Sequence, residues 1–341
     1  MRNRLPYATL SIIILNVLVY LITSSYPLDA PYDYGLIPSE LRDSYNFGRL
    51  VTSNFIHAGT LHLLLNMFML YLMGRGVERA IGNTEFIIFY LCGAFVAAST
   101  HALMVIATAD PSLETKPMVG ASGAVAGIAG FYIIRYHKKR IKFLGTEVSA
   151  VLLVLLWAVS QLGFAITGLY RDKIFGMDIN VVSYWSHIGG LLYGMTIAII
   201  SNMANNGQID YLIEKAAYNV DNNNFLEAAG DLERIIKIEP DNAYAHYELG
   251  KIWALLLEKE QSLPYYQNAI NLYVAQGKEK EALEVLANMK ATWNDSEIAP
   301  LIKFKLATFL SETGEFEKAI DMFREIATNS PNTPEAEMSI I

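Results

Sequence analysis

Six stretches of this chain contain no Asp, Glu, Lys or Arg, and this pattern constrains the fold more than any other feature. They cover residues 5–28, 51–74, 86–109, 117–134, 148–170 and 179–209. Each can supply a helix of about 20 residues, the length that a bilayer demands. The first stretch lacks a clear small-residue cleavage site, so we interpret it as a retained span. The pattern predicts an all-α, polytopic membrane protein with six transmembrane helices.

Charge divides the chain into two unlike parts. Residues 1–208 carry 14 Lys/Arg and 11 Asp/Glu, a net charge of +3, whereas residues 209–341 carry 12 and 23, a net charge of −11. We therefore predict a membrane domain over residues 1–207 and a soluble, acidic domain over 208–341, and this balance gives no indication of nucleic-acid binding. Cys92 is the single cysteine, which excludes an intramolecular disulfide and CxxC-type metal or redox motifs.

Basic residues between the predicted spans set the orientation. Nine fall on one side: Arg2, Arg4, Arg75, Arg79, Arg135, Lys138, Lys139, Arg140 and Lys142. Five fall on the other: Arg42, Arg49, Lys116, Arg171 and Lys173. The richer side should face the cytoplasm. We therefore expect a multi-pass protein of the cell membrane with both termini, and the acidic domain, in the cytoplasm.

Four polar side chains are predicted to lie at a similar depth. The second, fourth and sixth spans run in the same direction, and His62, Asn66, Ser122 and His187 all lie early in them. If the fourth helix begins at residue 117, Ser122 lies ~8 Å along it at 1.5 Å per residue. Polar side chains in lipid are unfavourable without partners, so the pattern indicates one shared cluster in the outer leaflet.

These four polar side chains have the chemistry that nucleophilic catalysis needs. The hydroxyl of Ser122 needs a base to take its proton, and His187 is the natural candidate, which predicts a Ser–His dyad. His62 and Asn66 share one helix face, and their N–H groups, with the Ser122 backbone amide, could stabilise an oxyanion. Glycines should bring the fourth and sixth helices together; they are Gly123, Gly127, Gly130, Gly189, Gly190 and Gly194.

Over roughly residues 1–205 the sequence resembles the rhomboid intramembrane serine proteases. The matching motifs are His57-x4-His62-x3-Asn66, Gly74-x3-Glu78-x3-Gly82, Gly120-x-Ser122-Gly123 and His187-x-Gly189-Gly190-x3-Gly194. The resemblance implies a six-helix fold and cleavage of other membrane proteins near or within their transmembrane segments, without metal, ATP or another cofactor. It implies Ser122 as nucleophile, His187 as base, and His62 and Asn66 as oxyanion donors. The supporting positions are His57, Arg49, Glu78, Gly120, Gly123, Gly189, Gly190 and Gly194.

The sequence departs from the family pattern at two places. Gly48-Arg49 stands where the family often has Trp-Arg, and Ala126 stands where many members have an aromatic residue that stacks on the histidine. We therefore expect other contacts to hold His187.

Other interpretations stay open. A Gly/Ser patch often marks only close helix packing, and the chain as a whole could be a catalytically silent rhomboid-like scaffold that binds membrane clients. A metal site at His57 and His62 is disfavoured, because no carboxylate or cysteine completes it. We expect His101 to be a packing or helix-bonding residue, and Glu78 with Arg79 to form a structural ion-pair or hydrogen-bonding site.

The acidic part shows repeats. Phe225, Ala228, Leu232 and Pro240 have the same spacing as Phe316, Ala319, Phe323 and Pro331. Between them, Gly250, Ser262 and Tyr266 fit the tetratricopeptide (TPR) pattern, although residues 278–289 break its 34-residue register. The resemblance to TPR proteins covers about residues 210–335 and implies a helical solenoid that binds a cytosolic protein or peptide. The alternative is an acidic helical domain that only adds solubility.

Overall fold

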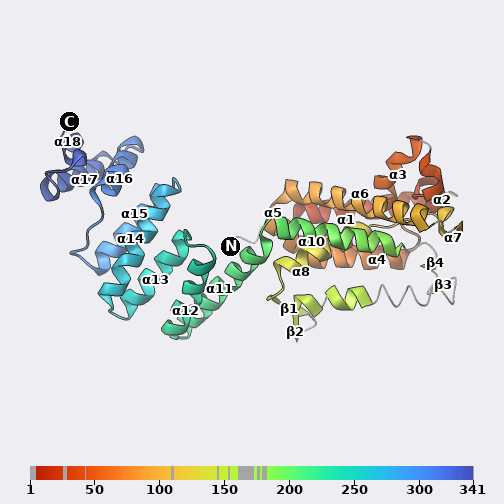
Figure 1. Ribbon diagram of the computed structural model, residues 1–341, viewed down its shortest axis with the longest axis horizontal. Helices are drawn as coiled ribbons and strands as arrows, with labels where there is room; N and C mark the ends of the chain where they lie inside the picture. The colour runs from red at the N-terminus through yellow and green to blue at the C-terminus, as the bar shows by residue number, and fades with distance from the viewer. Residues whose placement is uncertain are drawn as a thin grey trace. The chain divides into compact units, whose positions relative to one another are not determined.

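The structure is a computed structural model that describes residues 5–25, 29–42, 44–108, 111–143, 146–152, 154–159, 173–174, 177–178 and 183–340. It divides into two compact units between Gly207 and Gln208. Nearly all of the regular structure is helical (Figure 1).

The first unit contains long apolar helices joined by short helical turns. Its α-helices are α1 (Tyr7–Ser25), α2 (Ala30–Tyr34), α3 (Arg49–Thr52), α4 (Thr60–Met69), α5 (Arg75–Ile81), α6 (Asn83–Thr108), α7 (Pro111–Glu114), α8 (Ser122–Arg135) and α10 (Tyr184–Ile200). Short 3₁₀ segments cover Pro38–Arg42, Ser44–Gly48 and Ser53–Phe55, and one π-helical turn covers Leu70–Gly74. Residues 150–152 and 154–159 are also helical.

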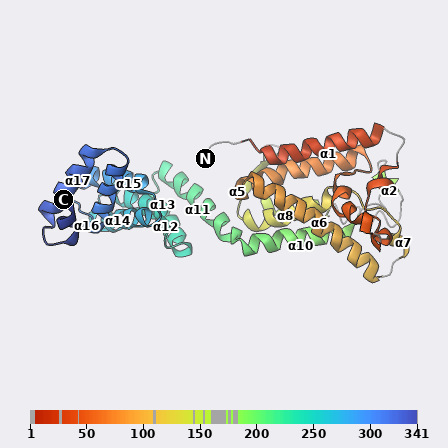
Figure 2. The same cartoon turned by 90° about the horizontal axis from the view of Figure 1, so that it is seen from above.

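Helix α8 lies at the centre of this unit. It packs against both α6 and α10, which also contact each other, and in Figure 2 α1 and α10 lie at opposite edges with α6 and α8 between them. Almost all of α8 is buried, including Ile128 and Phe131. Its small residues explain this position, because Gly and Ala let neighbouring helices approach closely.

The outer helices present apolar side chains away from this core. Ile14, Leu18 and Ile22 of α1 are 58%, 51% and 59% exposed, whereas Ile12 on the opposite face of the helix is buried. An apolar surface of this extent on a single unit is unfavourable in water. It is consistent with a membrane domain whose outer faces contact lipid.

The predicted spans correspond only in part to the helices. Among the described residues, α1 and α6 are long and apolar enough to cross a membrane, and the number rises to four if each of two broken pairs is one span. One pair joins residues 46–55 to 60–81 at an angle of 81°, and the other joins α10 to the helix that follows it. Residues 160–170 of the predicted fifth span lie outside the described residues, as do Arg2, Arg4 and Arg171. The number of six spans stays a prediction.

The expected start of the fourth span was wrong. α8 begins at Ser122 rather than at residue 117. The preceding segment is extended, since Met118 pairs with Leu36 in an isolated bridge, and Gly120 has a φ of +116°. Side-chain-bearing residues rarely adopt that conformation, and a helix cannot pass through it. Ser122 therefore stands at the first turn of its helix and not one turn inside it.

Two small hairpins depart from the all-α prediction. β1 (Arg140–Phe143) pairs antiparallel with β2 (Thr146–Ser149), from Arg140 opposite Ser149 to Phe143 opposite Thr146. β3 (Lys173–Ile174) pairs with β4 (Met177–Asp178). Both are local two-stranded ribbons outside the helical core.

The second unit is built from consecutive helices joined by short turns. They are α11 (Met203–Asp221), whose first turn belongs to the first unit, α12 (Phe225–Ile238), α13 (Ala243–Leu255), α14 (Lys259–Ala275), α15 (Glu279–Thr292), α16 (Pro300–Glu312), α17 (Phe316–Asn329) and α18 (Pro334–Ile340). The two predicted repeat starts, Phe225 and Phe316, are the first residues of α12 and α17. Ala228 and Ala319, three residues later, are buried in both.

The contact between α13 and α14 shows why the sequence folds in this way. Gly250 lies under the ring of Tyr266, where an added Cβ would be 3.0 Å from the ring atom Cγ. The Ser262 hydroxyl donates a hydrogen bond of 2.8 Å to the Gly250 carbonyl oxygen. A glycine, a small hydroxyl residue and an aromatic ring thus let these two helices pack closely.

Candidate active site

Ser122 and His187 meet across the contact between α8 and α10. The distance from His187 Nε2 to Ser122 Oγ is 2.7 Å, which is hydrogen-bonding distance. Ser122 is the first residue of α8, and His187 lies in the first turn of α10. His187 is buried, and its Nδ1 has no hydrogen-bond partner among the described residues. The pair has the geometry that a serine nucleophile and its base require.

Glycines in both helices make this approach possible. An added Cβ at Gly190 would clash with the Gly123 carbonyl oxygen, and one at Gly194 would clash with that of Gly127. At Gly130, a Cβ would meet the Leu191 carbonyl oxygen. The backbones of α8 and α10 are therefore in direct contact, and this contact fixes the relative position of Ser122 and His187.

One of the six expected glycines packs elsewhere. A Cβ on Gly189 would clash with Thr100 of α6, whereas one on Gly123 would lie 2.7 Å from Ala97 Cβ of α6 and 3.5 Å from Ser186 Cβ of α10. The expectation that Gly189 lies between α8 and α10 was therefore wrong. Its neighbour Gly190 takes that face, since adjacent residues point about 100° apart around a helix.

His101 also anchors α10 to α6. Its Nδ1 is hydrogen-bonded to the hydroxyl of Ser183, the N-cap of α10, and that hydroxyl accepts a 3.2 Å hydrogen bond from the Ser186 amide. An N-cap satisfies one of the free amides at a helix start. His101 therefore helps to hold the end of α10 that carries His187, in agreement with the helix-bonding role expected for it.

Gly120 places the loop before Ser122 against His62 and Asn66. An added Cβ on Gly120 would lie 2.6 Å from His62 Cε1, 2.8 Å from His62 Nε2 and 3.7 Å from Asn66 Nδ2. The Gly120 amide donates a 2.9 Å hydrogen bond to the Ser53 carbonyl oxygen. No side chain fits at this position, and its positive φ adds a second reason for glycine. Both side chains predicted as oxyanion donors therefore lie against Gly120, which stands two residues before the serine.

Asn66 has an available donor. Its Nδ2 is buried and has no hydrogen-bond partner among the described residues. This N–H group is therefore free to bind an oxyanion.

His57 lies next to His62, with their ring centroids 5.2 Å apart, and its Nδ1 is 3.3 Å from the Phe55 carbonyl oxygen. Within the described part of the chain, no group of three His, Cys, Asp or Glu side chains could hold a metal ion.

Two aromatic rings that the sequence did not indicate lie beside His187. The ring centroid of Trp157 is 6.0 Å from that of His187, and the Tyr184 centroid is 6.4 Å away at an interplanar angle of 89°. Ala126, where many family members carry an aromatic residue, is fully buried. Tyr184 stands three residues before His187, so helical spacing could have identified it, whereas nothing local connects Trp157 to the site.

Arg49 and Glu78 lie apart from the dyad and tie other segments together. Arg49 Nη1 is 2.8 Å from Glu40 Oε2 and 3.3 Å from the Gly35 carbonyl oxygen. Glu78 is buried and accepts hydrogen bonds from the amides of Ala8 and Thr9, at 2.9 and 2.8 Å, and from the Thr9 hydroxyl. Glu78 therefore satisfies the free amides at the start of α1, where a negative charge is favoured.

Comparison with known proteins adds an independent finding. The family model for the rhomboid domain matches residues 45–203. The putative rhomboid protease YdcA of Bacillus subtilis is 30% identical over 167 residues, which cover 46% of this chain and 71% of that protein. The rhomboid protease GluP of the same organism is 23% identical over 337 residues, 97% of this chain and 56% of its own length.

Similar proteins also occur in eukaryotes. RHOMBOID-like protein 4 of Arabidopsis thaliana is 30% identical over 152 residues, which cover 45% of this chain and 33% of that protein. Rhomboid-related protein 2 of Mus musculus is 27% identical over 173 residues, which cover 50% of this chain and 51% of that protein. The matched part of this chain thus covers only 33%, 51% and 56% of the lengths of RHOMBOID-like protein 4, Rhomboid-related protein 2 and GluP.

Proposed function

The chain belongs to the rhomboid family, and on that premise we propose that it is an intramembrane serine endopeptidase that cleaves the transmembrane segments of other membrane proteins. The observation that carries this proposal is the 2.7 Å hydrogen bond between His187 Nε2 and Ser122 Oγ. A histidine that only filled space would not need its ring nitrogen directed at a hydroxyl in an apolar unit.

In the first step, His187 Nε2 accepts the proton of Ser122 Oγ while that oxygen attacks the scissile carbonyl carbon. Negative charge then develops on the carbonyl oxygen. The Asn66 side-chain amide, the His62 ring and the Ser122 backbone amide are the proposed donors to it. The position of Ser122 supports this role, because the first amides of an α-helix have no partner within the helix and carry partial positive charge.

In the second step, the protonated His187 gives its proton to the leaving amine and the peptide bond breaks. A water molecule, deprotonated by the same nitrogen, then attacks the acyl-enzyme and releases Ser122. No acidic residue is part of this proposal, so the centre is a dyad rather than a triad. The contacts of Trp157 and Tyr184 keep the His187 ring oriented between the two proton transfers.

The proposal extends to topology and to the second unit. The distribution of basic residues supports a multi-pass protein of the cell membrane with both termini in the cytoplasm. The helical pairs of residues 208–341 support a TPR-like repeat domain that binds a cytosolic protein or peptide. The domain boundaries 1–207 and 208–341 belong to this proposal.

A fluorophosphonate probe tests the catalytic assignment. Membranes that contain the wild-type chain should show covalent labelling at Ser122, and the purified protein should cleave a model transmembrane substrate. Ser122→Ala should lose both, and His187→Ala should lose labelling and cleavage while inserting normally. An unlabelled Ser122 in a correctly inserted chain would instead favour the silent scaffold, and full cleavage by either variant would overturn the dyad.

A further inference from the structure

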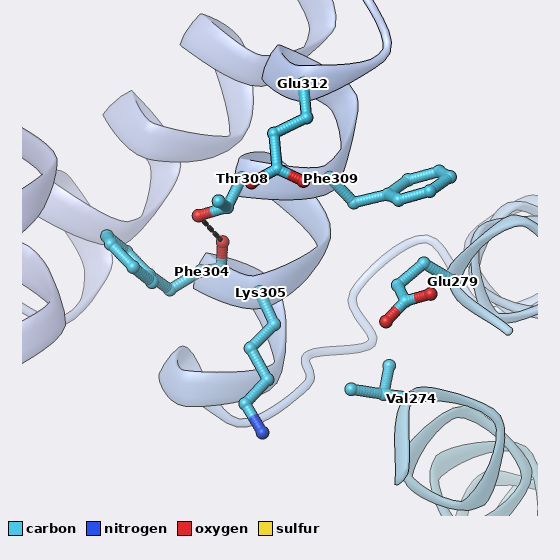
Figure 3. Close-up of a pocket in the computed structure, with 7 residues that line it drawn as sticks. All are labelled: Val274, Glu279, Phe304, Lys305, Thr308, Phe309 and Glu312. Atoms are coloured by element: carbon cyan, nitrogen blue, oxygen red, sulfur yellow. Dashed lines mark hydrogen bonds between the residues drawn. The ribbon is translucent and has the colours of Figure 1, made fainter. Parts of the chain in front are cut away.

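A groove in the second unit has the chemistry of a peptide-binding site. It lies between α16 and the α14–α15 connection and has a volume of about 510 Å³. Figure 3 shows Lys305 and Phe309 on the side of α16 that faces Val274 and Glu279. A volume in this range accommodates one large side chain together with its flanking backbone.

Apolar groups form one part of the groove. Val274 is buried at the end of α14, whereas Phe309 is only half-buried. Phe309 belongs to none of the hydrophobic cores formed by the described residues. Phe304, which points the other way in Figure 3, instead packs on Phe323 of α17 with ring centroids 5.4 Å apart. Phe309 is therefore the aromatic ring of α16 that is available to a ligand.

Two carboxylates that form no ion pair with a described residue border these apolar groups. Glu279 is half-buried and Glu312 is exposed, and neither makes an ion pair or a side-chain hydrogen bond with any described residue. Two other charged side chains on α15 and α16 do form ion pairs: Lys303 lies 2.8 Å from Glu297, and Lys290 lies 2.9 Å from Glu325. The groove contains one cation, Lys305, against two carboxylates.

We propose that this groove binds a cytosolic tail segment of a membrane protein in which a large apolar side chain lies next to Lys or Arg. The apolar side chain would pack on Phe309 and Val274, and the cation would lie between Glu279 and Glu312. Charge complementarity selects this occupant, because the cytoplasmic ends of membrane spans are enriched in Lys and Arg and the unit carries a net charge of −11. The inference rests on the proposed function, since it supplies the kind of client that the repeat unit would hold.

The test measures peptide binding apart from catalysis. A short fluorescent peptide of Leu, Lys and Ser is titrated with the full chain carrying Ser122→Ala, in detergent micelles, and fluorescence anisotropy reports the Kd. Glu279→Gln and Glu312→Gln should each weaken binding about two- to fivefold, the range for a partly solvated ion pair. Phe309→Ala should weaken it about fivefold or more, as expected for an aromatic contact. Peptides with Lys replaced by Glu, or Leu by Ser, should bind more weakly.

Glu317→Gln is the matched control, because Glu317 is an exposed glutamate at the start of α17 with no ion pair to a described residue. It should leave the Kd unchanged. Equal affinity of the wild-type, Glu279→Gln, Glu312→Gln and Phe309→Ala chains would overturn the proposal, and so would undiminished binding of the Glu-containing peptide. The two proposals can fail separately. If peptide binding depends on these residues but the chain with Ser122 intact cleaves no substrate, the protease assignment is refuted and the binding groove is still supported.

Discussion

At the scale of single residues, Asn66 is the sharpest test of the oxyanion proposal. Its buried Nδ2 has no partner among the described residues and lies next to the Gly120 backbone. Asn66→Ala should lower kcat by about 10²–10³, the usual effect of removing one oxyanion donor, with a smaller change in KM. Initial rates on a transmembrane substrate, with thermal unfolding in detergent as the control, check this. A variant that unfolds more easily but keeps its rate per folded molecule would make Asn66 a structural residue.

Trp157 is the second residue to test, since its ring lies 6.0 Å from that of His187. We expect Trp157→Ala to lower kcat up to about tenfold, because an aromatic pair is worth about 0.5–1.5 kcal/mol. Trp157→Phe should restore most of the rate, because it keeps a ring at the same place. KM should change little in both variants. If Phe and Ala are equally impaired, or if only KM changes, Trp157 contacts the substrate rather than positioning the base.

At the scale of elements, the contact between α8 and α10 holds Ser122 and His187 within hydrogen-bonding distance. Gly190→Ala should reduce stability by about 1–3 kcal/mol, the usual effect of overpacking, because the added Cβ meets the Gly123 carbonyl oxygen. It should also separate Ser122 from His187 and reduce fluorophosphonate labelling of the molecules that stay folded. Gly48→Ala is the matched control, since an added Cβ there meets nothing within 4 Å. Equal stability and labelling of the two variants would show that the helices adjust without loss.

The elements also show how far sequence reasoning reaches. Charge-free stretches and glycine spacing predicted α1, α6 and the approach of α8 to α10, because lipid burial and close packing leave a strong signature in composition. The predicted start of α8 was wrong because the helix cannot include Gly120, which has a positive φ. Contacts with Ser53 and His62, which are distant in the sequence, fix that conformation. The hydrogen bonds of Glu78 to the start of α1 join residues 69 and 70 positions apart, and no local pattern encodes such a pair.

At the scale of the whole molecule, the question is whether the second unit is needed for catalysis. Ser122 and His187, with every contact described around them, belong to residues 1–207. The proposed topology sets the acidic unit on the far side of about 30 Å of hydrocarbon from the predicted outer-leaflet site, so it would contribute no reacting group. Its expected role is to raise the local concentration of clients whose tails it binds.

A truncation tests this modular arrangement. The chain should be cut after Gly207 and not earlier, because Gly207 lies against the Arg135 carbonyl oxygen at the end of α8 and an added Cβ there would clash. We expect residues 1–207 to insert and to cleave a generic transmembrane substrate in detergent at a rate within about threefold of the full chain, since effective concentration acts only on tethered clients. In cells, the truncated form should lose preference for clients with basic, apolar cytosolic tails. A form that inserts and is labelled at Ser122 but cleaves nothing would show that the units are conformationally coupled, because an intact dyad would then depend on the repeats for turnover.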